Sequence, residues 1–488
     1  MTSGTPDKKA DWAILVYISA DGVLANFAVE SLKQLKRAAG DGVVVAAQVD
    51  KNGKRQARRY RFDGRGQIDS SIESNQKIVK NRALRRGIAY PTNLTAFVDW
   101  ASIKSGQPNA DHYCLFTWGH GAELLLDEDR PRADKGTTLR DYKSRRYLTP
   151  ANLRKALQDT KLKTEHRKSL DIIGIDACAM SMVEVAIELQ GYADFMVASQ
   201  EDVPDTSFPY ENILAGLKEK DGVKKEAKDA CKMIAELYKH AFSDYIASPS
   251  SGLRAITLSS LDLKKVDTIA RPLTSLADAL LASKSSQDMR EAILAARSES
   301  RGFAFGLFVD LSDFCGRLRK KLRRKNGNNA DLLKSACADI CKTLKERDGG
   351  FVVKNETDEK GKGCHGLSIY FPYRKDDETE AFQVLRAKGG ENRPLKGGEN
   401  RPLKGGENRP LKGGENRPLK GGENRPLKER SARIEELEED LKDLTRFNRT
   451  RWSKFIKEGW SFILATETSS GELDQHYSAQ QCAKNLAA

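Results

Sequence analysis

One stretch of the sequence, Leu170–Met180, most constrains what this chain can fold into. It begins as a short apolar, β-branched run, which is typical of a strand buried on both faces in a parallel sheet. The run stops at Asp176, and Ser181–Gln190 then has the apolar spacing of a helix that ends at Gly191. Cys178 is therefore expected in a strand-to-helix turn, at the sheet edge where ligands bind in open α/β folds. Exposed N–H groups and the helix dipole stabilise a thiolate at such a place.

A lone cysteine after a buried strand is most often a small core residue, so a second stretch is needed. His112–Trp118 is another short apolar run, and it ends in Gly119-His120-Gly121. A histidine between two glycines at the carboxyl end of a strand is poorly placed for the core and well placed to project from a tight turn. Two successive strands that end in His120 and Cys178 predict the base and nucleophile of a cysteine hydrolase.

A series of motifs in this chain resembles the clostripain family of cysteine peptidases, which shares a clan with caspases, gingipains, legumain and separase. The motifs are Trp12–Asp21, Trp118–Gly121, Asp176–Met180, Ala198–Pro204 with Phe208–Tyr210, and Gly366–Pro372. The resemblance covers residues 10–375 and resumes weakly around Trp452–Trp460. It implies an α/β, caspase-like three-layer sandwich, in which helices cover both faces of a mostly parallel central sheet and further helices are appended at the C-terminal side.

The resemblance also implies roles for individual residues. Cys178 would attack the peptide carbonyl, and His120 would take up a proton and then pass it to the departing amine. The backbone N–H groups of Gly121 and Cys178 would hold the oxyanion. Asp176 would line the first pocket and select Arg, with Lys as a second candidate, through a charge-assisted pair. A turn-forming role is the alternative for this aspartate.

The loop expected beside Cys178 is Ser199–Pro209, and two of its residues are further candidates for substrate binding. Ser199 opens the loop, and Asp205 is a candidate second carboxylate of the pocket. The loop departs here from the Pro-Gly-Asp-Gly-Trp-Pro-Tyr pattern of the family, because the aspartate has moved by one residue and the glycines are missing. The role of Asp205 is therefore open.

A long charged segment, residues 123–148, separates the histidine and cysteine strands. A solvated surface loop is one reading; the other is an activation loop, because resembling proteins mature by a cut after a basic residue in this interval. Arg130 precedes a proline, which most peptidases cut poorly. The candidate cleavage sites are Arg132, Lys135, Arg140, Lys143, Arg145 and Arg146. Both self-cleavage and cleavage by an upstream activating protease are open.

Charge and composition bear on partners and location. The 83 basic and 69 acidic residues give a formal net charge of +14, but the charge is spread out and no aromatic–basic stripe accompanies it. Nucleic acid is thus not the favoured partner; protein substrates with exposed Arg or Lys are. The eight cysteines show no metal-ligand spacing, and we expect neither a metal nor a cofactor. No apolar run is long enough for a membrane span, and no signal segment is recognised, so a cytoplasmic, defence-associated peptidase is expected.

The chain divides into three parts by sequence pattern. Residues 1–387 form the expected peptidase domain, and residues 388–427 repeat Lys-Gly-Gly-Glu-Asn-Arg-Pro-Leu five times. Frequent Gly and Pro and one Leu per repeat predict a flexible insertion rather than a core. Residues 428–488 form an expected helical segment that partly docks on the peptidase domain. The alternative function is a catalytically idle scaffold that recruits a protein or nucleic-acid partner through its basic surface and C-terminal helix.

Periodicity predicts most of the remaining elements. Strands are expected over Trp12–Ile18, Val43–Val49, Gln56–Phe62, Asp194–Ala198, Leu253–Leu258, Phe303–Val309 and Gly366–Phe371, and helices over Asn26–Ala39, Asn93–Lys104, Pro150–Gln158, Val223–Ala241, Leu263–Ala282 and Ala330–Arg347.

Overall fold

The computed structural model describes residues 9–20, 24–51, 57–62, 91–119, 139–141, 146–243, 255–303, 308–346, 349–371, 446 and 450–456. His120, Gly121, Arg132, Lys135, Lys143, Arg145, the octapeptide repeats and most of the C-terminal segment lie outside the described residues.

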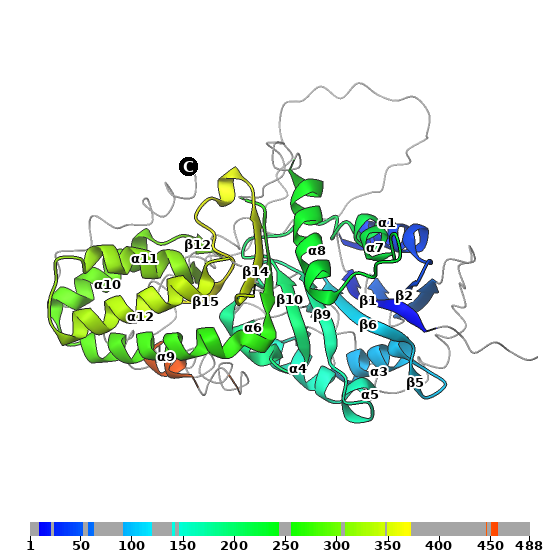
Figure 1. The fold of residues 1–488 in the computed structure, drawn as a ribbon, viewed down its shortest axis with the longest axis horizontal. Helices are drawn as coiled ribbons and strands as arrows, with labels where there is room; N and C mark the ends of the chain where they lie inside the picture. The colour runs from blue at the N-terminus through cyan, green and yellow to red at the C-terminus, as the bar shows by residue number, and fades with distance from the viewer. Residues whose placement is uncertain are drawn as a thin grey trace, which may run out of the picture.

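An eight-stranded sheet runs through the middle of the molecule (Figure 1). From edge to edge its strands are β14 (Val352–Thr357), β11 (Thr257–Asp262), β10 (Ala193–Ala198), β9 (Leu170–Asp176), β6 (Ala110–Trp118), β1 (Ala10–Ala20), β2 (Val43–Lys51) and β3 (Arg58–Phe62). The five strands from β10 to β2 pair in parallel, and the pairs at both edges are antiparallel. The sheet is therefore mostly parallel, as the resemblance implied.

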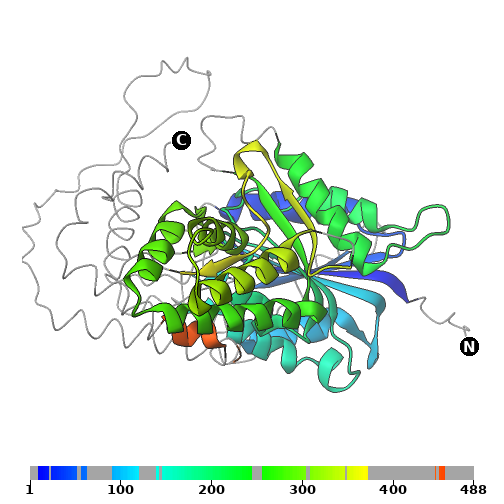
Figure 2. The ribbon, with the colours of Figure 1, turned by 60° about the vertical axis from the view of Figure 1, so that its left-hand side comes forward.

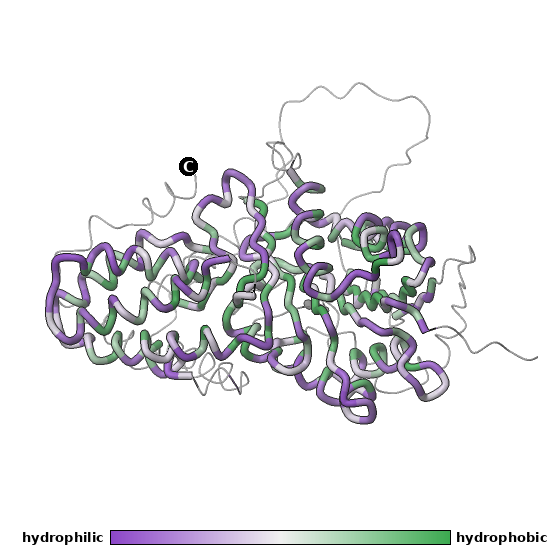
Figure 3. Tube along the Cα trace, in the orientation of Figure 1, coloured by the Kyte–Doolittle hydropathy of each residue, from purple (hydrophilic) through white to green (hydrophobic). Residues whose placement is uncertain are grey.

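Helices cover both faces of this sheet, because its central strands are apolar on both sides. One face packs against α1 (Leu24–Ala38), α7 (Tyr210–Leu217) and α8 (Ala227–Phe242), and the other against α3 (Pro91–Ser102), α4 (Pro150–Gln158), α5 (Lys161–Thr164) and α6 (Val183–Leu189). Figure 3 shows the apolar strands enclosed by helices whose outer surfaces are hydrophilic. A short hairpin of β4 (Ile103–Lys104) and β5 (Gln107–Pro108) follows α3.

A helical lobe extends from the β11 side of the sheet, and it comes forward in Figure 2. It contains α9 (Val266–Ser283), α10 (Gln287–Glu299), α11 (Leu311–Lys321) and α12 (Asn328–Leu344). A small sheet of β12 (Gly302–Phe303), β13 (Phe308–Asp310) and β15 (Ser368–Tyr370) joins the lobe to α6. No helix within the described ranges combines the length and the apolar character that a membrane span requires.

The short helix α15 (Arg451–Lys454) packs against this lobe. Trp452 is fully buried, its ring lies edge-on to Phe371 with centroids 5.2 Å apart, and its indole N–H donates to the Tyr370 carbonyl at 3.1 Å. Arg451 pairs with Asp278 of α9 at 2.6 Å. This part of the C-terminal segment thus completes the core of the lobe.

Two expected strands lie elsewhere than the pattern suggested. The strand expected over Leu253–Leu258 is found at Thr257–Asp262, and it runs antiparallel to β10. Phe303 and Val309 belong to two different strands, β12 and β13, whereas the strand expected over Gly366–Phe371 is found within that segment, as β15 of the small sheet. Helices α7, α10 and α11 and strand β14 were not expected.

Candidate active site

Cys178 lies in a turn that directly follows the carboxyl end of β9 and is held from two sides. On one side, the N–H groups of Ala179 and Ser181 donate to the carbonyls of Glu201 and Ser199, at 3.1 and 2.7 Å. On the other side, the Ser181 hydroxyl donates to the Gly366 carbonyl at 2.7 Å. Ala179 has a φ of 55°, a strained value for a residue with a Cβ. The turn is thus fixed, while Cys178 itself is only partly buried.

The helix after this turn begins at Val183, two residues later than expected. Met182 forms an isolated parallel bridge with Ser368, and the Ser368 N–H donates to the Ser181 carbonyl at 2.9 Å. This pairing keeps residues 181–182 extended. Four residues separate Cys178 from the first helical residue, so the helix dipole is further from the sulfur than the sequence pattern suggested.

The histidine strand and the cysteine strand are direct neighbours in the sheet. Trp118 of β6 pairs with Asp176 of β9, and the Gly119 N–H donates to the Asp176 carbonyl at 3.3 Å. His120 is the next residue of the chain and lies outside the described residues. Cys178 lies two positions after Asp176 in the chain, and His120 lies two positions after Trp118. Because consecutive Cα atoms are only about 3.8 Å apart, each residue is a short chain distance from this strand pair.

Asp176 is fully buried beneath the cysteine turn. Its Oδ2 accepts hydrogen bonds from the Phe208 N–H at 2.8 Å and from the Tyr210 hydroxyl at 3.3 Å. Its Oδ1 is buried and has no hydrogen-bond partner among the described residues. Burial raises the pKa of this carboxyl well above its usual range. Asp176 therefore ties the loop before α7 to the cysteine strand, and half of its carboxylate is unused.

The loop residues Ser199 and Asp205 are in contrasting places. Ser199 is fully buried, and its hydroxyl is within hydrogen-bond distance of the Thr257 hydroxyl and the Glu201 carbonyl, at 2.8 and 2.9 Å. Asp205 is exposed to solvent. Of the carboxylates proposed for the pocket, Asp176 is thus enclosed and Asp205 is accessible. The substrate-binding roles of all three residues stay predictions.

A buried polar network that sequence reasoning missed supports the loop from behind. The Gln200 amide donates to Asp310 Oδ2 at 3.0 Å and accepts from the Gly366 N–H at 2.8 Å. Asp310 Oδ1 also lies 2.9 Å from Nδ1 of His365, and this hydrogen bond raises the pKa of His365. Asp310 is separated from Gln200 by more than a hundred positions, so no local pattern could have indicated the contact.

Part of the expected activation loop has regular structure. Leu139–Asp141 (β7) pairs antiparallel with Arg146–Leu148 (β8), and β7 lies beside β1 of the central sheet. Arg140 and Arg146 are thus backbone members of a paired hairpin. The four residues between the strands include Lys143 and Arg145 and lie outside the described residues.

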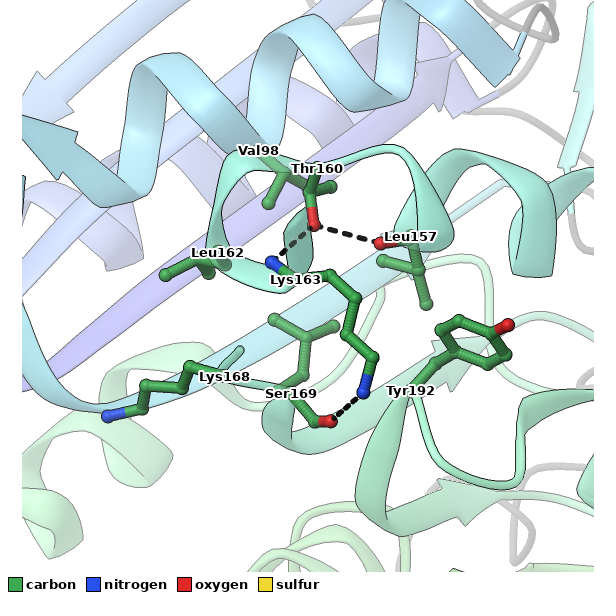
Figure 4. Close-up of a pocket in the computed structure, with 9 residues that line it drawn as sticks. Val98, Leu157, Thr160, Leu162, Lys163, Lys168, Ser169 and Tyr192 are labelled. Carbon is green, nitrogen blue, oxygen red and sulfur yellow. Dashed lines mark hydrogen bonds between the residues drawn. The ribbon is translucent and has the colours of Figure 1, made fainter. Parts of the chain in front are cut away.

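The small pocket in Figure 4 lies away from Cys178, at the amino end of β9. Its volume is about 10 Å³, room for a single water. Lys163 donates to the Ser169 hydroxyl at 2.9 Å within it. The described residues contain no group of three or more His, Cys, Asp and Glu side chains arranged to hold a metal ion.

The chain is similar to a known protein family and to several solved structures. A family model described as the clostripain family matches residues 16–376, well over half of the chain. Similar solved structures include an inactive zymogen C11 protease from Parabacteroides distasonis, with 18% identity, a TM-score of 0.49, and coverage of 78% of this chain and 97% of that chain. Another is a secreted C11 cysteine protease from Bacteroides thetaiotaomicron in complex with an irreversible peptide inhibitor, with 16% identity, a TM-score of 0.47, and coverage of 74% and 93%. No match was found among the curated proteins. With the family model covering both candidate catalytic strands, this chain belongs to the clostripain family of cysteine peptidases.

Proposed function

We propose that this cysteine peptidase cleaves after arginine with a dyad of Cys178 and His120, and that it is made as a zymogen. The observation that carries the dyad is the pairing of Trp118 with Asp176, which brings the ends of the two strands together at one edge of the sheet. Cys178 Sγ attacks the substrate carbonyl, and His120 accepts a proton and returns it to the leaving amine. The backbone N–H groups of Gly121 and Cys178 hold the oxyanion.

The preference for arginine is assigned to Asp176. Asp176 has a buried oxygen without a hydrogen-bond partner among the described residues and a raised pKa, and an entering guanidinium would pair with this oxygen and favour the ionised form of the carboxyl. A substrate Lys is a second candidate for this pocket, since its ammonium group carries the same positive charge but lacks the paired N–H donors of a guanidinium. Asp205 is the alternative carboxylate because it is exposed in the facing loop.

Activation is assigned to the segment between the two catalytic strands. Its basic residues match the proposed specificity, and a cut between β7 and β8 would leave both new ends anchored by the hairpin and the sheet. The activating agent is a second copy of the enzyme or an upstream protease of different specificity. The cytoplasmic location stays a prediction.

The test is hydrolysis of fluorogenic peptides that present Arg, Lys or Ala before the reporter group. We expect the Arg peptide to be cleaved fastest, and Cys178→Ala and His120→Ala each to lower kcat/KM by at least about a thousandfold. Cys341→Ala is the matched control, because Cys341 is also a partly buried thiol but lies in the helical lobe. Activity that survives in either dyad variant would reject the assignment.

A further inference from the structure

The end of α11 carries an unusual concentration of positive charge. Seven of the nine residues from Arg317 to Lys325 are basic: Arg317, Arg319, Lys320, Lys321, Arg323, Arg324 and Lys325. Cations in the last turn of a helix complement its dipole, which explains one or two of them. The contacts of these residues divide them into two sets.

The first set is neutralised by acidic residues of the lobe. Arg317 pairs with Asp313 at 2.8 Å, Lys321 pairs with Glu299, and Lys325 pairs with Asp288 at 3.0 Å. Glu299 and Asp288 belong to α10, so these cations join α11 to its neighbour. They have an evident structural role.

The second set has no such partners. Arg319, Lys320, Arg323 and Arg324 are exposed, and none of them forms an ion pair with any described residue. The first three line an open cleft of about 560 Å³ between α11 and α12, together with Gly316, Lys334 and Ser335. Lys334 is held in place by Asp331 at 2.7 Å. The cleft is thus lined by four cations and a hydroxyl, and three of the cations have no ion-pair partner among the described residues.

Gly316 forms the part of the cleft that belongs to the helix backbone. Glycine is unfavourable inside a helix, and close packing is the usual reason for tolerating it. No atom lies within 4 Å of the position that a Cβ would occupy at Gly316, so packing does not require glycine there. Positions 316, 319 and 320 share one face of α11, and Arg323 lies in the turn that follows the helix. The missing side chain leaves the floor of the cleft open to a ligand.

We propose that this cleft binds a phosphate-bearing polyanion through Arg319, Lys320, Arg323 and Lys334. Guanidinium groups bind phosphate oxygens in pairs, and Ser335 supplies a hydroxyl donor. None of the described residues that line the cleft is aromatic, which favours recognition of phosphates over stacking with bases. An acidic peptide fits less well, because alternate side chains of an extended chain point away from the surface that they meet. Free oligophosphates and a nucleic-acid backbone share the required chemistry.

The test is fluorescence polarisation of a labelled oligothymidylate of about 15 nucleotides with the full-length Cys178→Ala protein, which cannot process itself, at about 50 mM salt. The double variant Arg319→Gln/Arg323→Gln should bind at least about tenfold more weakly and reduce the salt slope by about 1.4. Arg317→Gln/Lys321→Gln removes the same charge from the paired set and should change binding less than about twofold. Gly316→Leu fills the floor at unchanged charge and should also weaken binding.

Competition separates the sources of the phosphate. Displacement of the probe by inorganic tripolyphosphate at low concentration assigns a free oligophosphate, and displacement only by longer nucleic acid assigns a backbone. Polyglutamate that competes equally per charge would overturn the proposal, as would equal losses in the two double variants or no binding of any probe. Thermal midpoints check that each variant is folded. If the arginine double variant does not fold, the comparison of Gly316→Leu with the protein that keeps Gly316 tests the proposal instead. Binding of the probe that is unchanged by Gly316→Leu would then contradict binding in the cleft. The outcome is independent of peptidase activity.

Discussion

Only one of the two carboxylate oxygens of the buried Asp176 forms hydrogen bonds with described residues. Oδ2 holds the Phe208 N–H and the Tyr210 hydroxyl, whereas Oδ1 is enclosed without a partner among the described residues. The first arrangement is structural and the second is what a cation-binding pocket needs. The two roles are compatible, because asparagine can keep the acceptor for Phe208 while it removes the charge.

This compatibility makes Asp176→Asn an informative substitution. We expect kcat/KM for an Arg peptide to fall by about 10²–10³-fold, because a desolvated charge pair is lost, while the thermal midpoint changes little. Asp205→Asn is the matched control, since Asp205 is an exposed carboxylate of the facing loop. It should stay within about twofold of wild type. The reverse result, with Asp205→Asn impaired and Asp176→Asn active, would transfer the selecting role to Asp205.

Among the secondary-structure elements, α6 stands out because all seven of its residues are buried, two glutamates included. Glu188 pairs with Arg154 at 2.9 Å. Glu184 Oε1 accepts the Tyr370 N–H at 2.8 Å, its Oε2 has no hydrogen-bond partner among the described residues, and burial raises its pKa to about 7. Between about pH 4.5 and 7, Glu184 is therefore protonated in the folded protein and ionised in the unfolded chain.

A pH dependence of stability follows. Between about pH 4.5 and 7 the unfolded chain is ionised at this position while the folded protein is protonated, so the free energy of unfolding falls as pH rises through this window. Glu184→Gln, in a Cys178→Ala background, should therefore raise the free energy of unfolding by up to about 3 kcal/mol at pH 8 and by almost nothing at pH 4.5. Urea unfolding at both pH values measures the difference. A gain of the same size at pH 4.5 would mean that packing, not ionisation, is responsible.

The elements that sequence reasoning placed well are those with a continuous local signal. Strands β6 and β9 each have a short, largely apolar centre, Tyr113–Phe116 and Ile172–Ile175, so their ends and the residues that follow them could be predicted. Strand β11 could not, because Thr257, Ser259 and Ser260 are polar by type. All three are buried, since their hydroxyls bond to Ser199, Asn355 and the Cys231 carbonyl. Such partners are distant in the sequence, and the Met182 bridge that delays α6 is of the same kind.

At the scale of the whole molecule, the octapeptide repeats differ in composition from the rest of the chain. They contribute five of the fourteen net positive charges but only one leucine per copy, too little for a core. Deletion of residues 388–427 should leave kcat/KM for an Arg peptide within about twofold of wild type. A second variant that replaces the tract by an equally long Gly-Ser segment controls for spacing. Activity lost in the deletion and restored by the Gly-Ser segment would identify a length requirement, and activity lost in both would assign the tract a specific role.

The proposed activation also concerns the whole molecule, because one cut would divide the chain between the two candidate catalytic strands. Proteases need a locally extended, unpaired segment, and β7 and β8 pair through Arg140 with Tyr147 and Asp141 with Arg146. Cleavage is therefore expected between the strands, after Lys143 or Arg145, more readily than after Arg140 or Arg146. The sites at Arg132 and Lys135 stay open.

To test this prediction, wild type and Cys178→Ala are incubated separately, and the new N-termini that form are sequenced. Fragments that form from wild type but not from Cys178→Ala show self-processing. Fragments that form from both proteins, and only after a second protease is added, show activation in trans. Lys143→Gln/Arg145→Gln should slow self-processing at least about tenfold while the paired Arg140→Gln control processes normally. A wild type that stays intact and is fully active would refute the zymogen, because a loop that need not be cut does not block the cleft.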